Sequence, residues 1–128
     1  MAIFNKTIST LERSLDFSMA KNRIIAHNIA NVDTPRYKAK DVVFKNILQE
    51  KTLQAKRTHP RHLPFKGDQQ SNYRVITKSH TMYNHNRNNV DIDREMAELA
   101  KNQIYYQAMV DRLNGEFSNL QTVIRGGN

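Results

Sequence analysis

The sequence predicts a mainly α-helical protein whose long N- and C-terminal helices pair as an antiparallel, coiled-coil-like hairpin. Apolar residues recur at spacings of four and three at both ends of the 128-residue chain, a pattern typical of helices that pack along a continuous stripe. Between them this periodicity is lost, so we expect an irregular central insert, partly β-strand or loop. The predicted divisions are residues 1–33, 34–89 and 90–128.

The C-terminal segment carries the clearest helical pattern. Nine of the ten positions that follow the spacing are apolar or aromatic: Ile92, Met96, Leu99, Gln103, Tyr106, Val110, Leu113, Phe117, Leu120 and Ile124. Acidic residues from Asp91 onwards favour the positive end of a helix dipole, and Gly126 provides a stop after Arg125. We therefore expect a helix over residues 92–124, about 50 Å long at about 1.5 Å per residue.

The N-terminal segment repeats the pattern more loosely. Its stripe consists of Phe4, Ile8, Leu11, Leu15, Ser18, Asn22, Ile25 and Ile29. Ser18 and Asn22 are the polar members, and such residues cost stability but can fix the register of paired helices. The helix is expected to end before Pro35, because the residue preceding a proline is displaced from helical geometry.

The central segment carries the excess positive charge. Residues 32–89 have a net charge of +8, against +2 for residues 1–31 and −2 for residues 90–128. A basic segment of this kind could bind an acidic protein, nucleic acid or an anionic membrane surface, and charge alone does not choose among them. Within it, residues 73–77 are compatible with a strand, and residues 59–64 and 84–89 are expected to be loops.

The residues do not support an enzyme. Two histidine pairs lack the i,i+4 spacing of a helical metal motif; they are His59 with His62 and His80 with His85. Four acids fit the first turns of a solvated helix better than a catalytic cluster; they are Asp91, Asp93, Glu95 and Glu98. No nucleophile motif is present. We expect no catalytic residue, cofactor, metal or small-molecule substrate.

Nor do the residues predict membrane insertion or disulfide bonds. The chain has no cysteine, no apolar run of about 18 residues that could span a membrane, and no apolar core of a secretory signal peptide near its start.

The apolar stripes predict assembly. Full burial of a large apolar side chain contributes about 1.5–3 kcal/mol, whereas ordering each residue costs about 1–2 kcal/mol of backbone entropy, so a lone helix pair is marginal. We expect neighbouring copies to supply the missing burial. The predicted assembly interface is Ile8, Leu11, Leu15, Ile25, Ile29, Ile92, Met96, Leu99, Tyr106, Val110, Leu113, Phe117, Leu120 and Ile124.

The first helix is followed by a turn with a recognisable sequence, Ala26-His27-Asn28-Ile29-Ala30-Asn31-Val32-Asp33-Thr34-Pro35-Arg36-Tyr37-Lys38. Asparagine side chains can bond local backbone groups where a helix ends, proline fixes the backbone, and tyrosine offers an aromatic anchor with a polar tip. We expect a rigid exit from the helix that sets the direction of the insert. The predicted signature turn is Asn28, Asn31, Thr34, Pro35, Tyr37 and Lys38.

This turn resembles the N-terminal signature of the flagellar rod and hook axial proteins. The run Asn89-Val90-Asp91-Ile92-Asp93-Arg94-Glu95-Met96, followed by Asn102, Tyr105, Tyr106 and Gln107, is similar to the C-terminal signature of the proximal rod members of that family. The resemblance covers essentially the whole chain. It departs at Arg36 and Arg87, which occupy turn positions where the family commonly has glycine.

The resemblance implies a structural role. Members of this family pass through the flagellar type III export channel without a cleaved signal peptide and assemble helically in the periplasmic rod, where they transmit torque and line the export channel. The implied partners are copies of the chain, other rod proteins, the rod–membrane-ring adaptor and the export apparatus.

Two other functions remain alternatives at this stage. The first is a nucleic-acid-binding module, in which aromatic residues of the basic insert would stack on bases; these are Tyr37, Phe44, Phe65, Tyr73 and Tyr83. No nucleic-acid-binding motif accompanies them. The second is a soluble coiled-coil adaptor, which would form closed oligomers instead of an open helical array.

Overall fold

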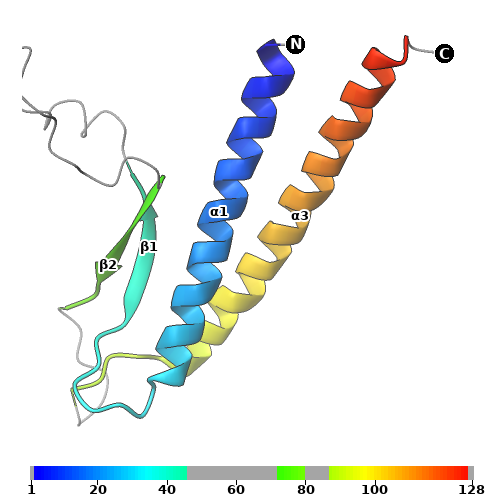
Figure 1. Cartoon of the computed structure of the whole chain (residues 1–128). Coiled ribbons are helices and arrows are strands. Elements are labelled where there is room, and N and C mark those ends of the chain that lie inside the picture. The colour runs from blue at the N-terminus through cyan, green and yellow to red at the C-terminus, as the bar shows by residue number, and fades with distance from the viewer. Residues whose placement is uncertain (1, 46–71, 80–86, 127–128) are drawn as a thin grey trace, which may run out of the picture.

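Two long antiparallel helices and a small two-stranded ribbon make up the computed structural model, which describes residues 2–45, 72–79 and 87–126. The elements are α1 (Ala2–Ala30), β1 (Lys40–Phe44), β2 (Tyr73–Thr77) and α3 (Ile92–Ile124). Both chain ends lie at the same end of the helix pair, and β1 lies between α1 and β2 (Figure 1). The predicted helical hairpin is confirmed, and so are the bounds of the C-terminal helix.

Local side-chain bonds define the ends of both helices. Asp91 is the N-cap of α3, and its carboxylate accepts hydrogen bonds from the backbone N–H groups of Asp93 and Arg94. At the other end, Gly126 has a φ of 85°, the left-handed conformation in which helices commonly terminate. Helix α1 ends at Ala30, where the Asn31 side chain donates to the carbonyl of His27 at 2.8 Å. The first helix therefore ends four residues before the position that Pro35 alone would require.

A buried polar pair connects the middle of α1 to the first third of α3. The Ser18 hydroxyl donates to Asn102 Oδ1 at 3.0 Å, and Asn102 Nδ2 returns a bond to the Ser18 carbonyl at 2.8 Å. Because Ser18 is fully buried and Asn102 is 6% exposed, a shift of one helix along the other would leave these groups unpaired. Ser18 therefore fixes register as the sequence predicted, whereas Asn22 is exposed and does not.

One turn closer to the connection, an ion pair crosses between the helices. Lys21 Nζ lies 3.0 Å from Glu98 Oε2, and Lys101 lies 3.4 Å from the other carboxylate oxygen. The hydrogen bond from Lys21 is the main reason that the pKa of Glu98 is lowered. The pair is partly solvated, so it contributes orientation more than stability.

The face of α3 that meets α1 is not centred on the predicted stripe. The buried residues of α3 are Glu95, Asn102 and Glu116, which repeat at multiples of seven and so share one side of the helix. Members of the predicted stripe flank that side and are exposed or half-buried. The periodicity identified the apolar positions correctly, but burial of complementary polar groups rotated the helix about its axis.

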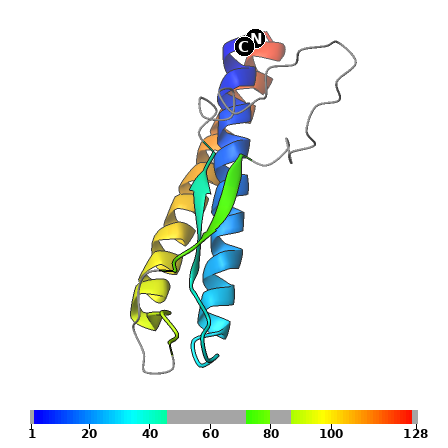
Figure 2. The ribbon, with the colours of Figure 1, turned by 90° about the vertical axis from the view of Figure 1, so that its left-hand side faces the viewer.

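The ribbon is an antiparallel pair with Lys40 opposite Thr77 and Phe44 opposite Tyr73. It is attached to α1 by a stacked pair of rings, Phe17 and Phe44, whose centroids are 3.9 Å apart. Val42, between the two ends of β1, is buried. Figure 2 shows the ribbon extending along the helix pair from the end at which the chain turns. Residues 73–77 form the strand that the sequence favoured, whereas β1 was not predicted.

Several sequence expectations fall outside the described residues. These are the histidines His59, His62, His80 and His85, the aromatic residues Phe65 and Tyr83, and the loop over residues 59–64.

We predict that Ser18→Ala destabilises the isolated protein by about 1–3 kcal/mol, because Asn102 Oδ1 would lose its donor in a buried site. Urea unfolding followed by circular dichroism measures the effect. The matched control is Ser14→Ala on the same helix, whose hydroxyl bonds only to the Thr10 carbonyl and whose loss should change stability by less than about 0.5 kcal/mol. Equal effects of the two substitutions would contradict the assigned role of Ser18.

Candidate assembly site at the helix–ribbon junction

The Asn28 side chain connects three parts of the fold. Its Oδ1 accepts from the Lys40 backbone N–H at 2.9 Å and from the Tyr37 hydroxyl at 3.2 Å. Its Nδ2 donates to the Lys40 carbonyl at 2.8 Å and to Glu95 Oε2 at 3.1 Å. A primary amide has two donor hydrogens and two acceptor lone pairs, so every bonding position of this 1%-exposed side chain is filled.

Glu95 is the acidic component of the junction. It is only 7% exposed, which corrects the expectation that the acids at the start of α3 are all solvated. Its carboxylate approaches Asn28 instead of water, and its backbone N–H bonds to the Asp91 carbonyl at 2.9 Å. Glu95 therefore links the first turn of α3 to the last turn of α1.

The environment of the junction changes the pKa of the Tyr37 side chain. Burial, followed by the negative charge of Glu95, raises the pKa of the Tyr37 phenol above its ordinary value of 10.0. The phenol therefore remains protonated at neutral pH and can donate to Asn28. Because the pKa is higher in the folded state, this stabilisation is fully present below about pH 10 and is lost as the pH rises through the folded-state pKa.

Asn88 closes the turn that follows α1. Its Nδ2 lies 2.8, 2.9 and 2.8 Å from the carbonyl oxygens of Asn31, Val32 and Thr34. Its Oδ1 accepts from the Val90 N–H at 2.8 Å. A carbonyl buried without a donor costs about 1–3 kcal/mol, and the fully buried Asn88 supplies a donor to three carbonyls of the irregular turn after α1.

Asn89 extends the ribbon beyond its last backbone pair. Its Oδ1 accepts from the Ala39 N–H at 2.6 Å, and its Nδ2 donates to the Lys78 carbonyl. The side-chain amide thus bridges one N–H and one C=O of opposite strands, as a peptide group would in a sheet. Together with Asn28 it fixes both strands relative to the two helices.

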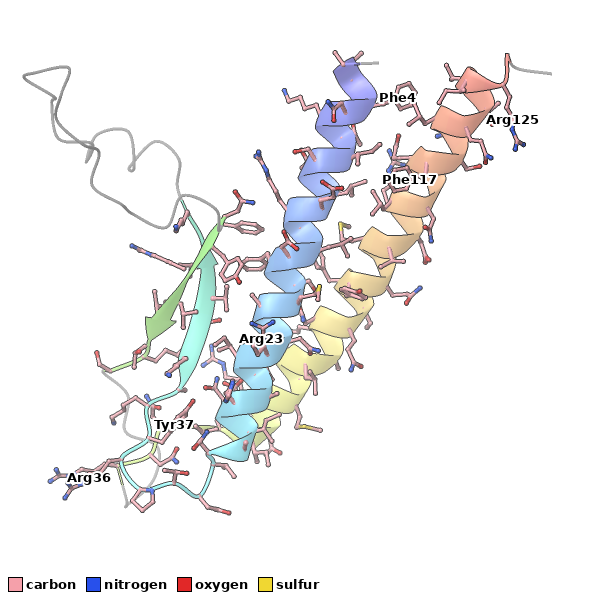
Figure 3. All side chains as sticks on the ribbon, viewed as in Figure 1. Phe4, Arg23, Arg36, Tyr37, Phe117 and Arg125 are labelled. Carbon is pink, nitrogen blue, oxygen red and sulfur yellow. The ribbon has the colours of Figure 1, made fainter. Side chains whose placement is uncertain are left out.

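Several side chains of the predicted signature turn are joined by hydrogen bonds. Asn28 bonds Tyr37 directly, Thr34 donates to Asn31 Oδ1 at 3.1 Å, and the Lys38 ammonium donates to the Arg87 carbonyl at 2.9 Å. Pro35 is exposed, so its contribution is to backbone geometry. Figure 3 shows Tyr37 directed towards the helices and Arg36 directed away from them.

Sequence reasoning did not identify the contacts that Asn88, Asn89 and Glu95 make. Asn89 and Glu95 lie within the C-terminal signature, so the signal was present, but their partners are 50 and 67 residues away in the chain. Spacing along one segment cannot reveal such a contact.

The two arginines at turn positions where the family commonly has glycine adopt a left-handed backbone conformation. Arg36 and Arg87 have φ values of 61° and 64°, the only positive values among non-glycine residues in the described segments. Arg36 is exposed, so its side chain has little packing to compensate for the strain of a left-handed backbone.

An exposed apolar seam extends from the junction along α3. We use the term exposed seam for Ile92, Met96, Tyr106, Phe117 and Ile124, which are 39–68% exposed. The other predicted residues of α3 are half-buried, as are Ile8, Leu15 and Ile29 of α1, whereas Leu11 and Ile25 are buried within the chain. Figure 3 shows Phe4 and Phe117 directed into the space between the diverging helix ends.

Other classes of site find no support in the described residues. No group of three or more potential metal ligands is present in residues 2–45, 72–79 and 87–126. Among these same residues, no helix is long and apolar enough to cross a membrane.

Long terminal helices joined through an asparagine-rich turn to a small ribbon agree with the mainly α-helical architecture expected from the resemblance to flagellar axial proteins. The chain is 49% identical over 99% of both lengths to the flagellar basal body rod protein FlgB of Bacillus subtilis. It is 31% identical to FlgB of Borreliella burgdorferi over 95% of this chain and 98% of that protein. It is 28% identical to FlgB of Escherichia coli over 91% of each. No protein-family model matches the sequence.

The chain belongs to the FlgB family of flagellar basal body rod proteins. It is a structural subunit of the rod, and the flagellar basal body is its location.

We predict that Asn28→Asp destabilises the protein by about 3 kcal/mol or more at pH 7, because an uncompensated carboxylate would face Glu95 and the Lys40 carbonyl. Two neighbouring carboxylates raise the pKa of the pair, so the loss should shrink as the pH falls and one of them becomes protonated. Thermal unfolding between pH 7 and pH 4.5 measures this difference relative to the unmodified protein.

Asn28→Ala provides the control, since it removes the hydrogen bonds without adding charge. Its destabilisation should depend on pH less steeply than that of Asn28→Asp over the same interval, because it adds no second carboxylate. If both variants show the same pH dependence, the contact between Asn28 and Glu95 does not contribute as described.

We predict that Arg36→Gly stabilises the protein by about 0.5–1 kcal/mol, the relief of left-handed backbone strain less the added freedom of glycine when unfolded. Arg36→Ala retains a Cβ atom and should give no such gain. Chemical denaturation of both variants distinguishes the backbone effect from loss of the guanidinium, and an equal gain in both would contradict it.

Proposed function

We propose that this chain assembles helically with copies of itself and with other rod proteins, through the exposed seam on α3, to form part of the flagellar rod. The observation that carries the proposal is the composition of the predicted α3 stripe. None of its ten positions is charged, and its exposed seam remains open to solvent in the single chain.

The physical argument is that a long uncharged stripe is unfavourable in water. Met96 and Phe117 are 52% and 46% exposed, so covering them would contribute about 1 kcal/mol each. A neighbouring helix fits such a stripe because apolar residues repeated every 3.5 positions stay aligned with a packed helix over many turns. The register bonds between Ser18 and Asn102 hold the helix pair in place without using this seam.

The junction supplies rigidity to the proposed assembly. Asn28, Asn88 and Asn89 fix the ribbon and turn to the helix pair through bonds to buried groups. A subunit that transmits torque must keep its contacts in fixed relative positions, and buried amide networks provide this specificity. Torque transmission and a wall around the export channel are therefore part of the proposal, as are contacts with the rod–membrane-ring adaptor and export apparatus.

We further propose that the chain is exported by the flagellar type III route without cleavage and that it has no catalytic activity. The nucleic-acid alternative is weakened by two observations. Tyr37 uses its hydroxyl at the junction, and one face of the Phe44 ring stacks on Phe17, so these groups already have partners within the chain, whereas base stacking requires free ring faces.

We predict that the double substitution Met96→Lys and Phe117→Lys abolishes swimming and removes the chain from isolated basal bodies. Two buried, unpaired ammonium groups would oppose assembly, whereas in the monomer both positions are about half-exposed. Swimming in soft agar and immunoblotting of purified basal bodies provide the measurements, in a strain that lacks its own copy of the protein.

Ala108→Lys is the matched control, because Ala108 is exposed on α3 but lies outside the stripe. It should leave swimming and incorporation unchanged. Melting temperatures of the purified variants test whether the monomers remain folded. Normal swimming of the double variant would refute assembly through this seam.

A further inference from the structure

The outer edge of β2 is an exposed strand edge. In the antiparallel register, Lys45 donates to the Asn72 carbonyl and Lys78 donates to the Ala39 carbonyl, and hydrogen-bonded pairs alternate with non-bonded pairs. The backbone groups of Tyr73, Val75 and Thr77 must therefore point away from β1. Val75 is 48% exposed, and β2 lies on the side of the ribbon remote from the helices (Figure 1).

At the opposite edge of the ribbon, outward backbone groups of β1 are occupied by hydrogen bonds to side chains. On β1, both backbone groups of Lys40 bond to Asn28, and the Val42 N–H donates to the Asp41 carboxylate at 2.8 Å. Natural proteins block strand edges because unpaired N–H and C=O groups recruit other strands. Within the described part of the chain, no hydrogen bond occupies the outward backbone groups of Tyr73, Val75 and Thr77.

The charge of the ribbon indicates what could bind there. The described ribbon segments contain Lys40, Lys45, Arg74 and Lys78 and a single acid, Asp41. Asp41 already pairs with Lys78 at 3.3 Å. Arg74 is exposed on β2 and has no carboxylate within ion-pair distance among the described residues. A second copy of the ribbon would bring like charges together, whereas an acidic segment would be attracted.

We propose that the outer edge of β2 binds an extended acidic segment of a different basal-body protein by β-augmentation. Backbone bonds to Tyr73, Val75 and Thr77 provide the pairing, and Arg74 selects the negative charge. The proposal rests on the proposed function, since it requires the chain to be present in the basal body. It assigns the ribbon a partner distinct from the one that covers the seam on α3.

A genetically encoded photo-crosslinking residue at position 77 tests the proposal in the assembled full-length chain. Purified basal bodies are irradiated, and the crosslinked peptides are identified by mass spectrometry. The expected product joins this chain to an acidic segment of another protein. A product joined to a second copy of this chain, a product with a non-acidic segment or no product would overturn the proposal.

Backbone variants then separate pairing from side-chain contact. Val75→Pro removes an N–H that points outwards and leaves the ladder bonds of Arg74 and Ile76 in place. It should reduce the crosslink at least about tenfold, because proline removes a donor and its ring obstructs a paired strand. Val75→Thr keeps the N–H and should leave the yield unchanged. An undiminished yield with proline would overturn pairing at this edge.

A charge variant keeps the test decisive if proline disturbs the ribbon. Arg74→Glu should lower the crosslink yield about fivefold or more, whereas Arg74→Lys should retain it, because only the former reverses the charge. Equal yields would overturn selection by charge. Immunoblotting of the same basal bodies distinguishes the two proposals: absence of the chain contradicts the proposed function, whereas presence without the crosslink contradicts only this inference.

Discussion

The fold depends on hydrogen bonds to the backbone groups of the irregular segments that lie where α1, β1, β2 and α3 meet. Asn28, Asn88 and Asn89 supply these bonds from their side-chain amides to backbone groups of the turn and the two strands. A primary amide offers donors and acceptors in the geometry of a peptide group, so it can stand in for a missing strand or helical turn. An aspartate offers only acceptors, and an apolar residue of similar size offers neither.

The two helices are held together partly by polar contacts, and this leaves apolar side chains exposed along α3. The bonds between Ser18 and Asn102 and the ion pair between Lys21 and Glu98 set the register of the helices. Since these polar contacts occupy the side of α3 that meets α1, the apolar stripe is rotated to the flank. A helix pair that buried its stripe internally would be more stable alone but would have less to offer a neighbour.

Sequence reasoning succeeded where a property is local. The bounds of α3 follow from Asp91 and Gly126, which act within one helical turn. The positive φ values of Arg36 and Arg87 fall where glycine was expected. The reasoning was wrong for Glu95, because an acid near a helix N-terminus is usually solvated. It also missed β1, whose five residues have no distinguishing pattern of their own.

The sequence by itself determined the bounds of α3 and the apolar positions that share a side of each helix, since these depend on residues a few positions apart. The apolar pattern at both ends of the chain also predicted that the two helices pair. Only the tertiary structure decided which side of α3 meets α1 and that Asn28 joins Lys40 to Glu95. The physical reason is that a polar residue can be buried when its partner is present. That partner can lie anywhere in the chain, so periodicity within a segment carries no information about it.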